Sequence, residues 1–421
     1  MGGKAFLSLL PDTTFPRLAP AVYASLKSTL LPRLTPLFQH VGVPHEAPEK
    51  QDYGDVDFVV VCPDAVVRNH EEIKSALGAS VCIPSPQPDG RGTHHFALRL
   101  ADLVPSPQLP IATAAEEVVA AAAETTSDIY VQVDVNVRRD VQDWENAMFF
   151  HAYGDLGMIM GRLAASVGLH LGELGLKVLL SFSSVLAIRT NVAQMTSQAL
   201  VPTHSSTFPL SASMPDILSF FELSMERWKA GFATQHEAFE WIASSRFYVP
   251  GQISIPTSRA KSRSTRSMYQ AYFQWNDARA KATAENDDSL SPQKQESDDR
   301  ETAIQTVGQE ALVFFGKQEE HNALVQENEQ RLRVKAMWNG RKVGEWTGWN
   351  GRLIGRLMNF MRQTVGEQNI GQMTEEELKQ QVLRVKENIE AQLVEEQQTR
   401  ESVQADVNVE QEGTKLKDST D

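Results

Sequence analysis

Two aspartates one residue apart, Asp55 and Asp57, stand at the head of the apolar run Phe58-Val59-Val60-Val61. On a β-strand, residues at this spacing project from the same face. Two carboxylates side by side in a partly buried sheet are costly unless a cation lies between them. Carboxylate oxygens are the ligands that Mg²⁺ takes, and Mg²⁺ often accompanies phosphate substrates. The pair therefore predicts a strand that carries a divalent metal site.

A third aspartate, Asp134, lies in the middle of the segment 128–137, which alternates with period two. One face is aliphatic and the other carries Tyr130, Gln132, Asp134 and Asn136, which is the pattern of a half-buried strand. If this strand lies beside the first, three carboxylates converge. Such a trio can hold two Mg²⁺ or Mn²⁺ ions that activate a hydroxyl and stabilise leaving pyrophosphate. The alternative is that these acids face solvent on edge strands.

The composition excludes several classes of protein. The chain has 421 residues, enough for two or three domains, and a net charge of −14, which excludes a surface built throughout to coat nucleic acid. No apolar run has the length of a membrane span. Two cysteines, Cys62 and Cys82, make a disulfide framework improbable and suit a reducing compartment. We therefore expect an intracellular protein of the cytoplasm or nucleus, with no membrane partner.

Hydrophobic periodicity and composition divide the chain into five regions, and the expected fold class is α+β. Residues 1–150 form a mixed β-sheet domain, and residues 151–276 are mainly helical. Residues 277–305 hold few large apolar groups and are expected to form a flexible insert, because they bury too little surface to offset ordering. A helical domain at 306–400 precedes a polar tail, 401–421, that is expected to be disordered.

Within the first region, the pattern predicts helices near 20–38 and 68–78, and strands at 55–61, 94–100 and 129–137. The middle region is interrupted by two Gly- or Ser/Thr-rich stretches, 154–175 and 196–215, where its helical pattern breaks.

The segment Gly54-Asp55-Val56-Asp57, followed by Asp134 on an alternating strand, resembles the DNA polymerase beta-like nucleotidyltransferase superfamily. The segments 50–57, 130–135 and 151–156 are similar to a group of fungal proteins with this fold. The resemblance implies transfer of a nucleoside monophosphate from an NTP to RNA or another hydroxyl acceptor. It implies that Asp55 and Asp57 hold both metal ions (Mg²⁺ or Mn²⁺). Asp134 would complete the second metal site and assist deprotonation of the acceptor.

The superfamily also carries a Gly-Ser or Gly-Gly pair before the acids, where backbone amides grip the β- and γ-phosphates. Here Gly42 has suitable spacing, but Val43 and Pro44 follow it, and proline has no backbone N–H to donate. We expect Gly42 and Lys50 to take the phosphate-gripping role.

Gly54 and Arg99 are further candidates for contact with the NTP, and for Arg99 a salt bridge at the strand edge is an equal alternative. The altered phosphate loop keeps a second hypothesis open: a catalytically silent nucleotidyltransferase fold that binds nucleotide or RNA, or that acts as a scaffold. A third hypothesis is transfer of AMP to a protein.

The segment 339–358 is similar to a helical element of CCA-adding tRNA nucleotidyltransferases and bacterial poly(A) polymerases. There a short Asn-Gly helix leads through a glycine turn into a second helix, and Gly348 and Gly351 permit such a turn here. Further along, an apolar stripe runs from Leu378 to Leu393 at helical spacing. It predicts either packing onto its own domain or dimerisation.

Three smaller patterns have two interpretations each. The basic residues Arg259, Lys261, Arg263 and Arg266 precede the aromatics Tyr269, Tyr272, Phe273 and Trp275. They predict an RNA-binding surface or, preferably, a helix that faces the core. Cys62, Cys82, His94 and His95 do not fit the spacing of a structural zinc site, so buried thiols are preferred. His151 and Asp155 are either partners of the metal site or a helix-surface pair.

Overall fold

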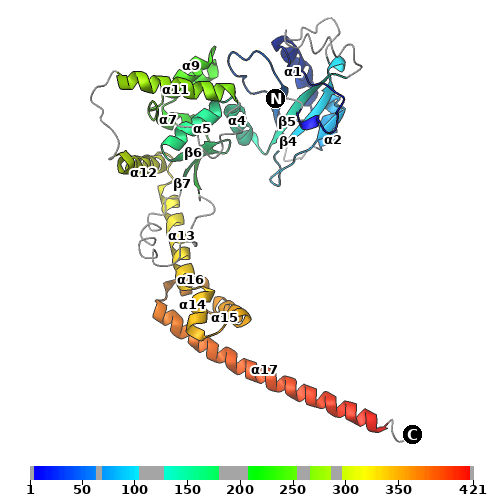
Figure 1. Ribbon diagram of the computed structural model, residues 1–421, viewed down its shortest axis with the longest axis vertical. Coiled ribbons are helices and arrows are strands. Elements are labelled where there is room, and N and C mark those ends of the chain that lie inside the picture. The colour runs from blue at the N-terminus through cyan, green and yellow to red at the C-terminus, as the bar shows by residue number, and fades with distance from the viewer. Residues whose placement is uncertain are drawn as a thin grey trace. The chain divides into compact units, whose positions relative to one another are not determined.

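The computed structural model describes residues 4–62, 69–103, 128–179, 207–253, 266–285 and 296–417. These residues fall into two compact units, one ending at Gln318 and the other beginning at Glu319 (Figure 1). The first unit holds a five-stranded mixed sheet, a small second sheet and several helices, which confirms the α+β class. No helix in the described ranges is both long enough and apolar enough to cross a bilayer.

The main sheet has the strand order β1-β2-β5-β4-β3. Its strands are β1 (His40–Gly42), β2 (Asp55–Val61), β5 (Tyr130–Arg138), β4 (Gly92–Arg99) and β3 (Val81–Ile83). β2 and β5 are parallel, and every other neighbouring pair is antiparallel. The three strands predicted from alternation, at 55–61, 94–100 and 129–137, are confirmed to within two residues at each end.

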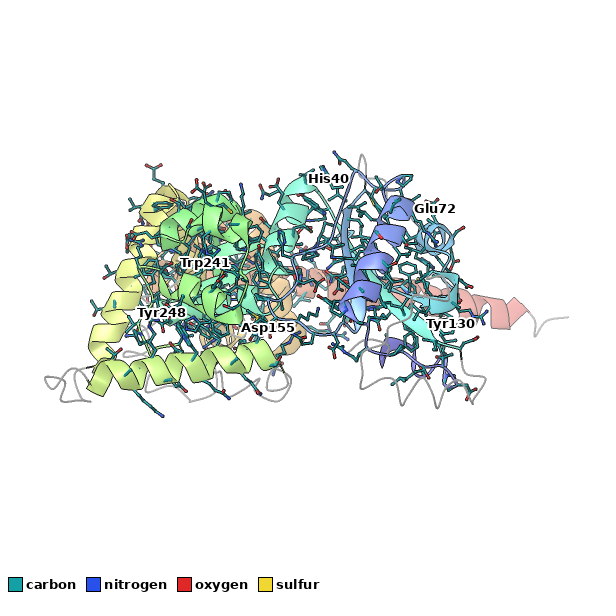
Figure 2. The ribbon with its side chains drawn as sticks, turned by 90° about the horizontal axis from the view of Figure 1, so that it is seen from above. His40, Glu72, Tyr130, Asp155, Trp241 and Tyr248 are labelled. Atoms are coloured by element: carbon teal, nitrogen blue, oxygen red, sulfur yellow. The ribbon has the colours of Figure 1, made fainter. Side chains whose placement is uncertain are left out.

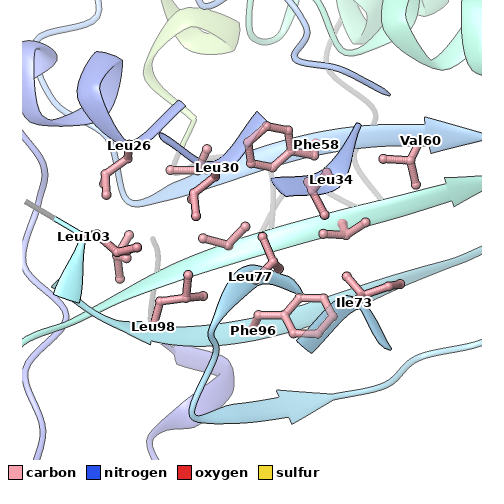
Figure 3. Packing of buried hydrophobic residues seen from close by; sticks show 14 of the residues in the cluster. Leu26, Leu30, Leu34, Phe58, Val60, Ile73, Leu77, Phe96, Leu98 and Leu103 are labelled. Carbon is pink, nitrogen blue, oxygen red and sulfur yellow. The ribbon is translucent and has the colours of Figure 1, made fainter. Parts of the chain in front are cut away.

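Helices α1 (Pro20–Leu34) and α2 (His70–Leu77) cover one face of this sheet (Figure 3). Leu26, Leu30 and Leu34 recur every four residues, so they share one side of α1 and are fully buried against the strands. Val, Phe and Leu side chains at alternate positions of β2, β5 and β4 complete this core. Because strand side chains alternate, the remaining positions of these strands must lie on the opposite face.

That opposite face is partly covered by α4 (Val141–Phe150), which packs against β1 and β2. Trp144 fixes the helix to the sheet by donating from Nε1 to the carbonyl oxygen of Val59 at 2.9 Å. The contact lies beside Asp57 along β2, so α4 forms one side of the region in which the acids are found.

The rest of the first unit contains a second sheet that the sequence pattern did not predict. β6 (Leu169–Gly172), β7 (Gly175–Leu179) and β8 (Thr207–Ser211) pair antiparallel. Each strand has four or five residues, which is too short to give a clear alternation within a region read as mainly helical. The expectation of a mainly helical middle region is therefore incomplete.

The described helices of this part are α5 (Leu156–Ser166), α7 (Met214–Phe221), α8 (Met225–Ala230), α9 (Gln235–Ala243), α11 (Ser267–Glu285) and α12 (Glu296–Phe314). Among them, α5 and α7 pack against the small sheet, and α9 and α11 pack against α5. Figure 2 shows Trp241 and Tyr248 within this helical part, and Tyr130 on the part that holds the main sheet. On α11, Tyr269, Tyr272 and Phe273 are buried, so this helix faces the core as preferred from its sequence. Residues 259–263 lie outside the described residues.

Two segments expected to lack structure are helical where the structure describes them. α11 continues to Glu285 and α12 begins at Glu296, so both ends of the segment 277–305 belong to helices. α17 (Glu375–Lys417) runs through most of the tail expected to be disordered. These stretches are rich in Ala, Glu, Gln and Lys, whose intrinsic helix propensity is high.

In the second unit, the described elements are the helices α13 (Gln318–Met337), α14 (Gly340–Thr347), α15 (Gly351–Thr364), α16 (Glu367–Gln372) and α17. The glycine turn predicted between two helices is present, with Gly348 in the left-handed region at φ 72°. Leu378, Val382 and Ile389 of α17 are buried in a core shared with α14 and α15. The stripe therefore packs onto its own domain, the first of its two alternatives.

Candidate functional site

The register of β2 and β5 brings the three aspartates onto one face of the main sheet. Asp57 lies directly opposite Asp134, and Asp55 lies opposite Gln132. Paired strands are about 4.8 Å apart, so Asp57 and Asp134 are nearest neighbours across the sheet. The two strands are thus adjacent and in phase, as a site built from three carboxylates requires.

Asp57 has the most perturbed carboxyl group of the three. Its pKa is raised to about 8, chiefly by desolvation and next by the charge of Asp55. Asp134 and Glu46 raise the pKa further, whereas the ammonium group of Lys50 lowers it. Solvent still reaches the Asp57 side chain, as is usual for a group on the floor of a concave site. The surroundings of Asp57 therefore disfavour a negative charge that no cation balances.

Asp134 is held by two polar side chains on the same face. Its Oδ1 atom lies 2.8 Å from Nδ1 of His95, which is directly opposite on β4, and accepts a hydrogen bond from Nε2 of Gln132 at 2.9 Å. Desolvation raises the pKa of Asp134, whereas both hydrogen bonds lower it. The sequence offered His95 only as a zinc ligand, because the register that pairs it with Asp134 is not visible in the chain.

Glu46 is a fourth acid beside Asp57 that sequence reasoning missed. The hydroxyl group of Tyr23 donates to Glu46, and Nζ of Lys50 lies 2.8 Å from Glu46 Oε2. The Lys50 ammonium group also lies 4.4 Å from the centre of the Tyr53 ring, which stacks on Tyr23. The four-residue spacing of Glu46 and Lys50 was the only local signal of this contact. Lys50 is therefore at the site as expected, but it is already paired with Glu46.

A cavity of about 270 Å³ opens beside Asp57. Its lining includes Asp57 and three basic side chains, Lys50, His151 and Arg266. Arg266 is tied to Asp155, at the start of α5, by an ion pair of 2.8 Å. His151 and Asp155 thus line the same cavity, but they do not pair with each other. Asp155 pairs with Arg266, and His151 pairs with Glu173. The lining mixes acids with basic side chains, and Lys50, Arg266 and His151 are each paired with a carboxylate, so a ligand with phosphate groups would have to compete with these ion pairs.

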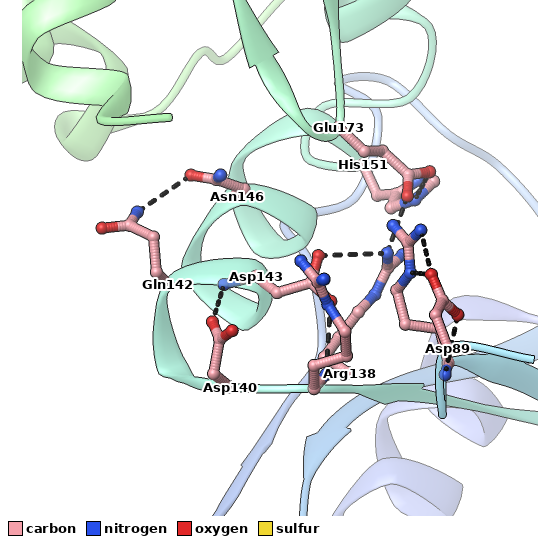
Figure 4. A network of polar contacts seen from close by, with 10 residues as sticks. Asp89, Arg138, Asp140, Gln142, Asp143, Asn146, His151 and Glu173 are labelled. Carbon is pink, nitrogen blue, oxygen red and sulfur yellow. Dashed lines mark hydrogen bonds and ion pairs between the residues drawn. The ribbon is translucent and has the colours of Figure 1, made fainter. Parts of the chain in front are cut away.

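Arg138, the last residue of β5, connects the sheet to this cavity wall (Figure 4). Its buried Nη1 atom lies 2.7 Å from Glu173 Oε2 and 3.8 Å from Oδ1 of the buried Asp143. On its other side Glu173 bonds His151, with Nε2 to Oε1 at 2.7 Å. The hydrogen bond from His151, followed by the charges of His151 and Arg138, lowers the pKa of Glu173 to about 2. The charged chain fixes the orientation of the His151 ring at the cavity.

Arg99, Gly54 and Gly42 were the other residues proposed to contact the NTP. Arg99 pairs with Asp128 at 2.6 Å and lies four residues along β4 from His95, which is about 13 Å on a strand. Arg99 therefore forms a salt bridge at the strand edge, which was the alternative interpretation of this residue. Gly54 is buried immediately before β2.

Gly42 lies within β1 and serves helix packing. A Cβ atom there would lie 2.8 Å from Cζ2 of Trp144 and 2.8 Å from Cε of Met148, both on α4. The glycine therefore allows α4 to approach the sheet. This packing explains why position 42 carries a small residue, and no phosphate-binding role is needed to explain it.

We expect Gly42→Ala to destabilise the protein by about 1–2 kcal/mol, because the added methyl group overpacks the contact with the ring of Trp144. Thermal or urea unfolding measures the change. Gly308→Ala on α12 is the matched control, because its Cβ atom would meet Val178 at an ordinary 3.5 Å. That control should be neutral or slightly stabilising, since alanine is the better helix former. Equal effects at both positions would contradict the packing role of Gly42.

The donor chemistry of the face fits a hard divalent cation. Asp55, Asp57 and Asp134 supply carboxylate oxygens only, and desolvation, followed by the charges of the neighbouring acids, raises the pKa of Asp57. Within the described residues, however, no three His, Cys, Asp or Glu side chains are arranged as a complete set of metal ligands. The Asp134 carboxylate is instead directed to His95 and Gln132.

The raised pKa of Asp57 predicts how metal-free protein responds to pH. An acid whose pKa is near 3.8 when unfolded and about 8 when folded binds its proton more tightly in the folded state. The contribution of Asp57 to stability should therefore be greatest below pH 4 and decrease as the pH rises towards 8. Because solvent screens this accessible group, we expect the Asp57 contribution to the free energy of unfolding to fall by only about 1–2 kcal/mol between pH 4 and pH 8.

Urea unfolding of metal-free protein between pH 4 and pH 8, compared with Asp57→Asn, measures this contribution. The substitution should stabilise at pH 8 and have little effect at pH 4. Asp52→Asn is the control, since Asp52 forms only an exposed ion pair with Arg17. A gain in stability that does not depend on pH would contradict the prediction.

No model of a known protein family matches this chain, and no curated protein matches it significantly.

Proposed function

We propose that this protein transfers a nucleoside monophosphate from an NTP to a hydroxyl acceptor, RNA or another molecule, on the polar face of the main sheet. The observation that supports it most is the in-register pair Asp57 and Asp134, with Asp55 on the same face. The raised pKa of Asp57 and the position of Lys50 and Arg266 in the lining of the adjoining cavity support it further. The triphosphate would lie in this cavity, near Lys50 and Arg266.

In the proposed reaction, the acceptor oxygen attacks the α-phosphorus of the NTP and forms a new P–O bond. The bond from that phosphorus to the bridging oxygen breaks, and pyrophosphate leaves with the electron pair. The hydroxyl proton passes to the carboxylate of Asp134, whose raised pKa makes it a better base than an ordinary aspartate. His95 and Gln132 orient that carboxylate. Mg²⁺ or Mn²⁺ held by Asp55, Asp57 and Asp134 would neutralise the charge on the phosphates.

A second candidate is nucleotide binding without turnover, on a fold that keeps the acids but not the phosphate loop. The packing of Gly42 beneath α4 favours it, because the only glycine near the expected position has a structural role. The paired state of Lys50 favours it as well.

A transfer assay separates the two candidates. Full-length protein is incubated with each α-labelled NTP, Mg²⁺ or Mn²⁺, and total RNA or small hydroxyl compounds. Label in the acceptor together with released pyrophosphate supports transfer. Retention of NTP by wild-type protein, with no pyrophosphate above the Asp57→Asn background, would establish the binding candidate and reject the enzyme.

A further inference from the structure

A second and larger cavity, of about 650 Å³, adjoins the one beside Asp57. Its lining includes His45, Glu46, Tyr153, Arg227, Lys229 and Phe232. His45 and Glu46 line both cavities, so the two share one wall. This second cavity is wide open to solvent, and its volume falls in the range of pockets that bind small molecules, about 300–1,000 Å³. This cavity was not predicted from the sequence, because its lining comes from three separate segments of the chain.

The shared wall is rigidly built from two loops that meet. The backbone N–H of Tyr153 donates to the carbonyl oxygen of His45 at 2.6 Å, and the two rings stack in parallel with centroids 5.1 Å apart. Tyr153 has φ 57°, a left-handed conformation that a tyrosine adopts only where its surroundings compensate for the strain. The next residue, Gly154, lies against Ala47 so closely that a Cβ atom would come within 2.7 Å. Strain of this kind is concentrated at ligand-binding positions.

The charges in the second cavity leave one cation available for a ligand. Glu237 accepts hydrogen bonds from Arg227 at 2.7 Å and from the backbone N–H of Ala233 at 2.9 Å, so acid and guanidinium are engaged with each other. Glu46, on the shared wall, is engaged by Tyr23 and Lys50. Lys229 is exposed and has no ion-pair or hydrogen-bond partner among the described residues. A single free ammonium group beside a stack of rings suits a compact anion better than a long polyanion.

We propose that the second cavity binds the acceptor, and that the acceptor is a small phosphate-bearing hydroxyl compound such as a sugar phosphate. Its phosphate group pairs with Lys229, and its hydroxyl end reaches past Glu46 towards Asp57 and the triphosphate. The assignment of this ligand as the acceptor rests on the proposed function. Binding of the ligand in this cavity does not.

Saturation-transfer NMR with ribose 5-phosphate on the full-length protein tests the proposal. Lys229→Glu reverses the free charge, and Ala230→Trp fills the cavity from an exposed residue at the end of α8. We expect each substitution to weaken binding of ribose 5-phosphate at least about tenfold. Lys229→Glu removes a charge-assisted hydrogen bond, and Ala230→Trp occupies the space of the ligand. Lys281→Glu, which places the same change at an exposed position near the end of α11, is the control and should bind as the wild type does.

Three results would overturn the proposal: no saturation transfer to wild-type protein, binding that both cavity variants retain, or binding of a short RNA oligonucleotide that Lys229→Glu abolishes while ribose 5-phosphate does not bind. The transfer assay above separates this failure from failure of the proposed function. If pyrophosphate release depends on Asp57 but not on Lys229, the reaction stands and the acceptor site is wrong. If ribose 5-phosphate binding depends on Lys229 and no transfer occurs, the cavity stands as a binding site alone.

Discussion

Asp57→Asn is expected to lower NTP-dependent transfer by a factor on the order of 10³ or more, the largest effect on activity that the site predicts. The amide keeps the shape of the carboxylate but removes the negative charge at the centre of the acid cluster. Asp57 is in register with Asp134, and its pKa is influenced by Asp55, Asp134, Glu46 and Lys50 together. No other single residue of the face is linked to so many of these groups. Pyrophosphate release under Mg²⁺ or Mn²⁺ measures the loss.

The matched control for this experiment is Asp52→Asn. Asp52 lies near Asp57 in the chain, but its side chain is 46% exposed and pairs with Arg17. Surface ion pairs of this kind contribute about 1 kcal/mol or less, so the control should keep both its fold and its activity. Equal losses in the two variants, or full activity in Asp57→Asn, would remove the acid cluster from the mechanism. Folding of each variant is checked by circular dichroism before the assay.

The largest expected effect on stability is a loss of about 3–5 kcal/mol in Arg138→Met. The side chain of Arg138 is 4% exposed, and its guanidinium group lies between Glu173 and Asp143, whose side chain is only 2% exposed (Figure 4). Methionine fills a similar volume but leaves the buried carboxylate of Asp143 without this cation. An uncompensated buried charge is much more costly than an exposed one. Urea unfolding at neutral pH measures the change.

Arg139→Met is the control, because the adjacent arginine also approaches Asp143, at 3.7 Å, while its own side chain is 47% exposed. We expect this control to lose about 1 kcal/mol or less. If both variants lose the same stability, burial of Arg138 is not the cause.

A pH series adds an independent readout of the same network. The pKa of Glu173 is lowered from 4.5 to about 2, so its stabilising effect is complete above pH 4.5 and is lost as the pH falls towards 2. His151 makes the larger contribution to that shift and Arg138 a smaller one. The loss of stability in acid should therefore be smaller in Arg138→Met, but it should not disappear.

Much of the main sheet could be predicted from local pattern, and the reason is visible in β5. The segment 128–137 alternates without a break, so its aliphatic residues must face the core and Asp134 must face away. Asp55 and Asp57 follow the same rule on β2. Pattern failed where elements are short, as in β6 to β8, and where a polar segment of high helix propensity continues a helix, as at 401–417 of α17.

The candidate site was predicted only in part, because half of it is built by contacts between distant segments. Glu46 and His95 belong to no recognisable sequence motif. A loop brings Glu46 close to Asp57, and the register of β4 and β5 places His95 opposite Asp134. Gly42 shows the opposite error. Its spacing matched a phosphate-gripping glycine, but Trp144 and Met148, about a hundred residues later, require its small size.

The sequence by itself determined which residues of each strand share a face, since side-chain direction along a strand depends only on the backbone. It thereby placed the three aspartates on polar faces and the aliphatic residues in the core. The tertiary structure decided which strands are neighbours, which residues lie opposite one another, and which cavities form where loops meet. Those arrangements depend on packing between segments far apart in the chain, and register and loop contacts of that kind leave no local periodicity to read.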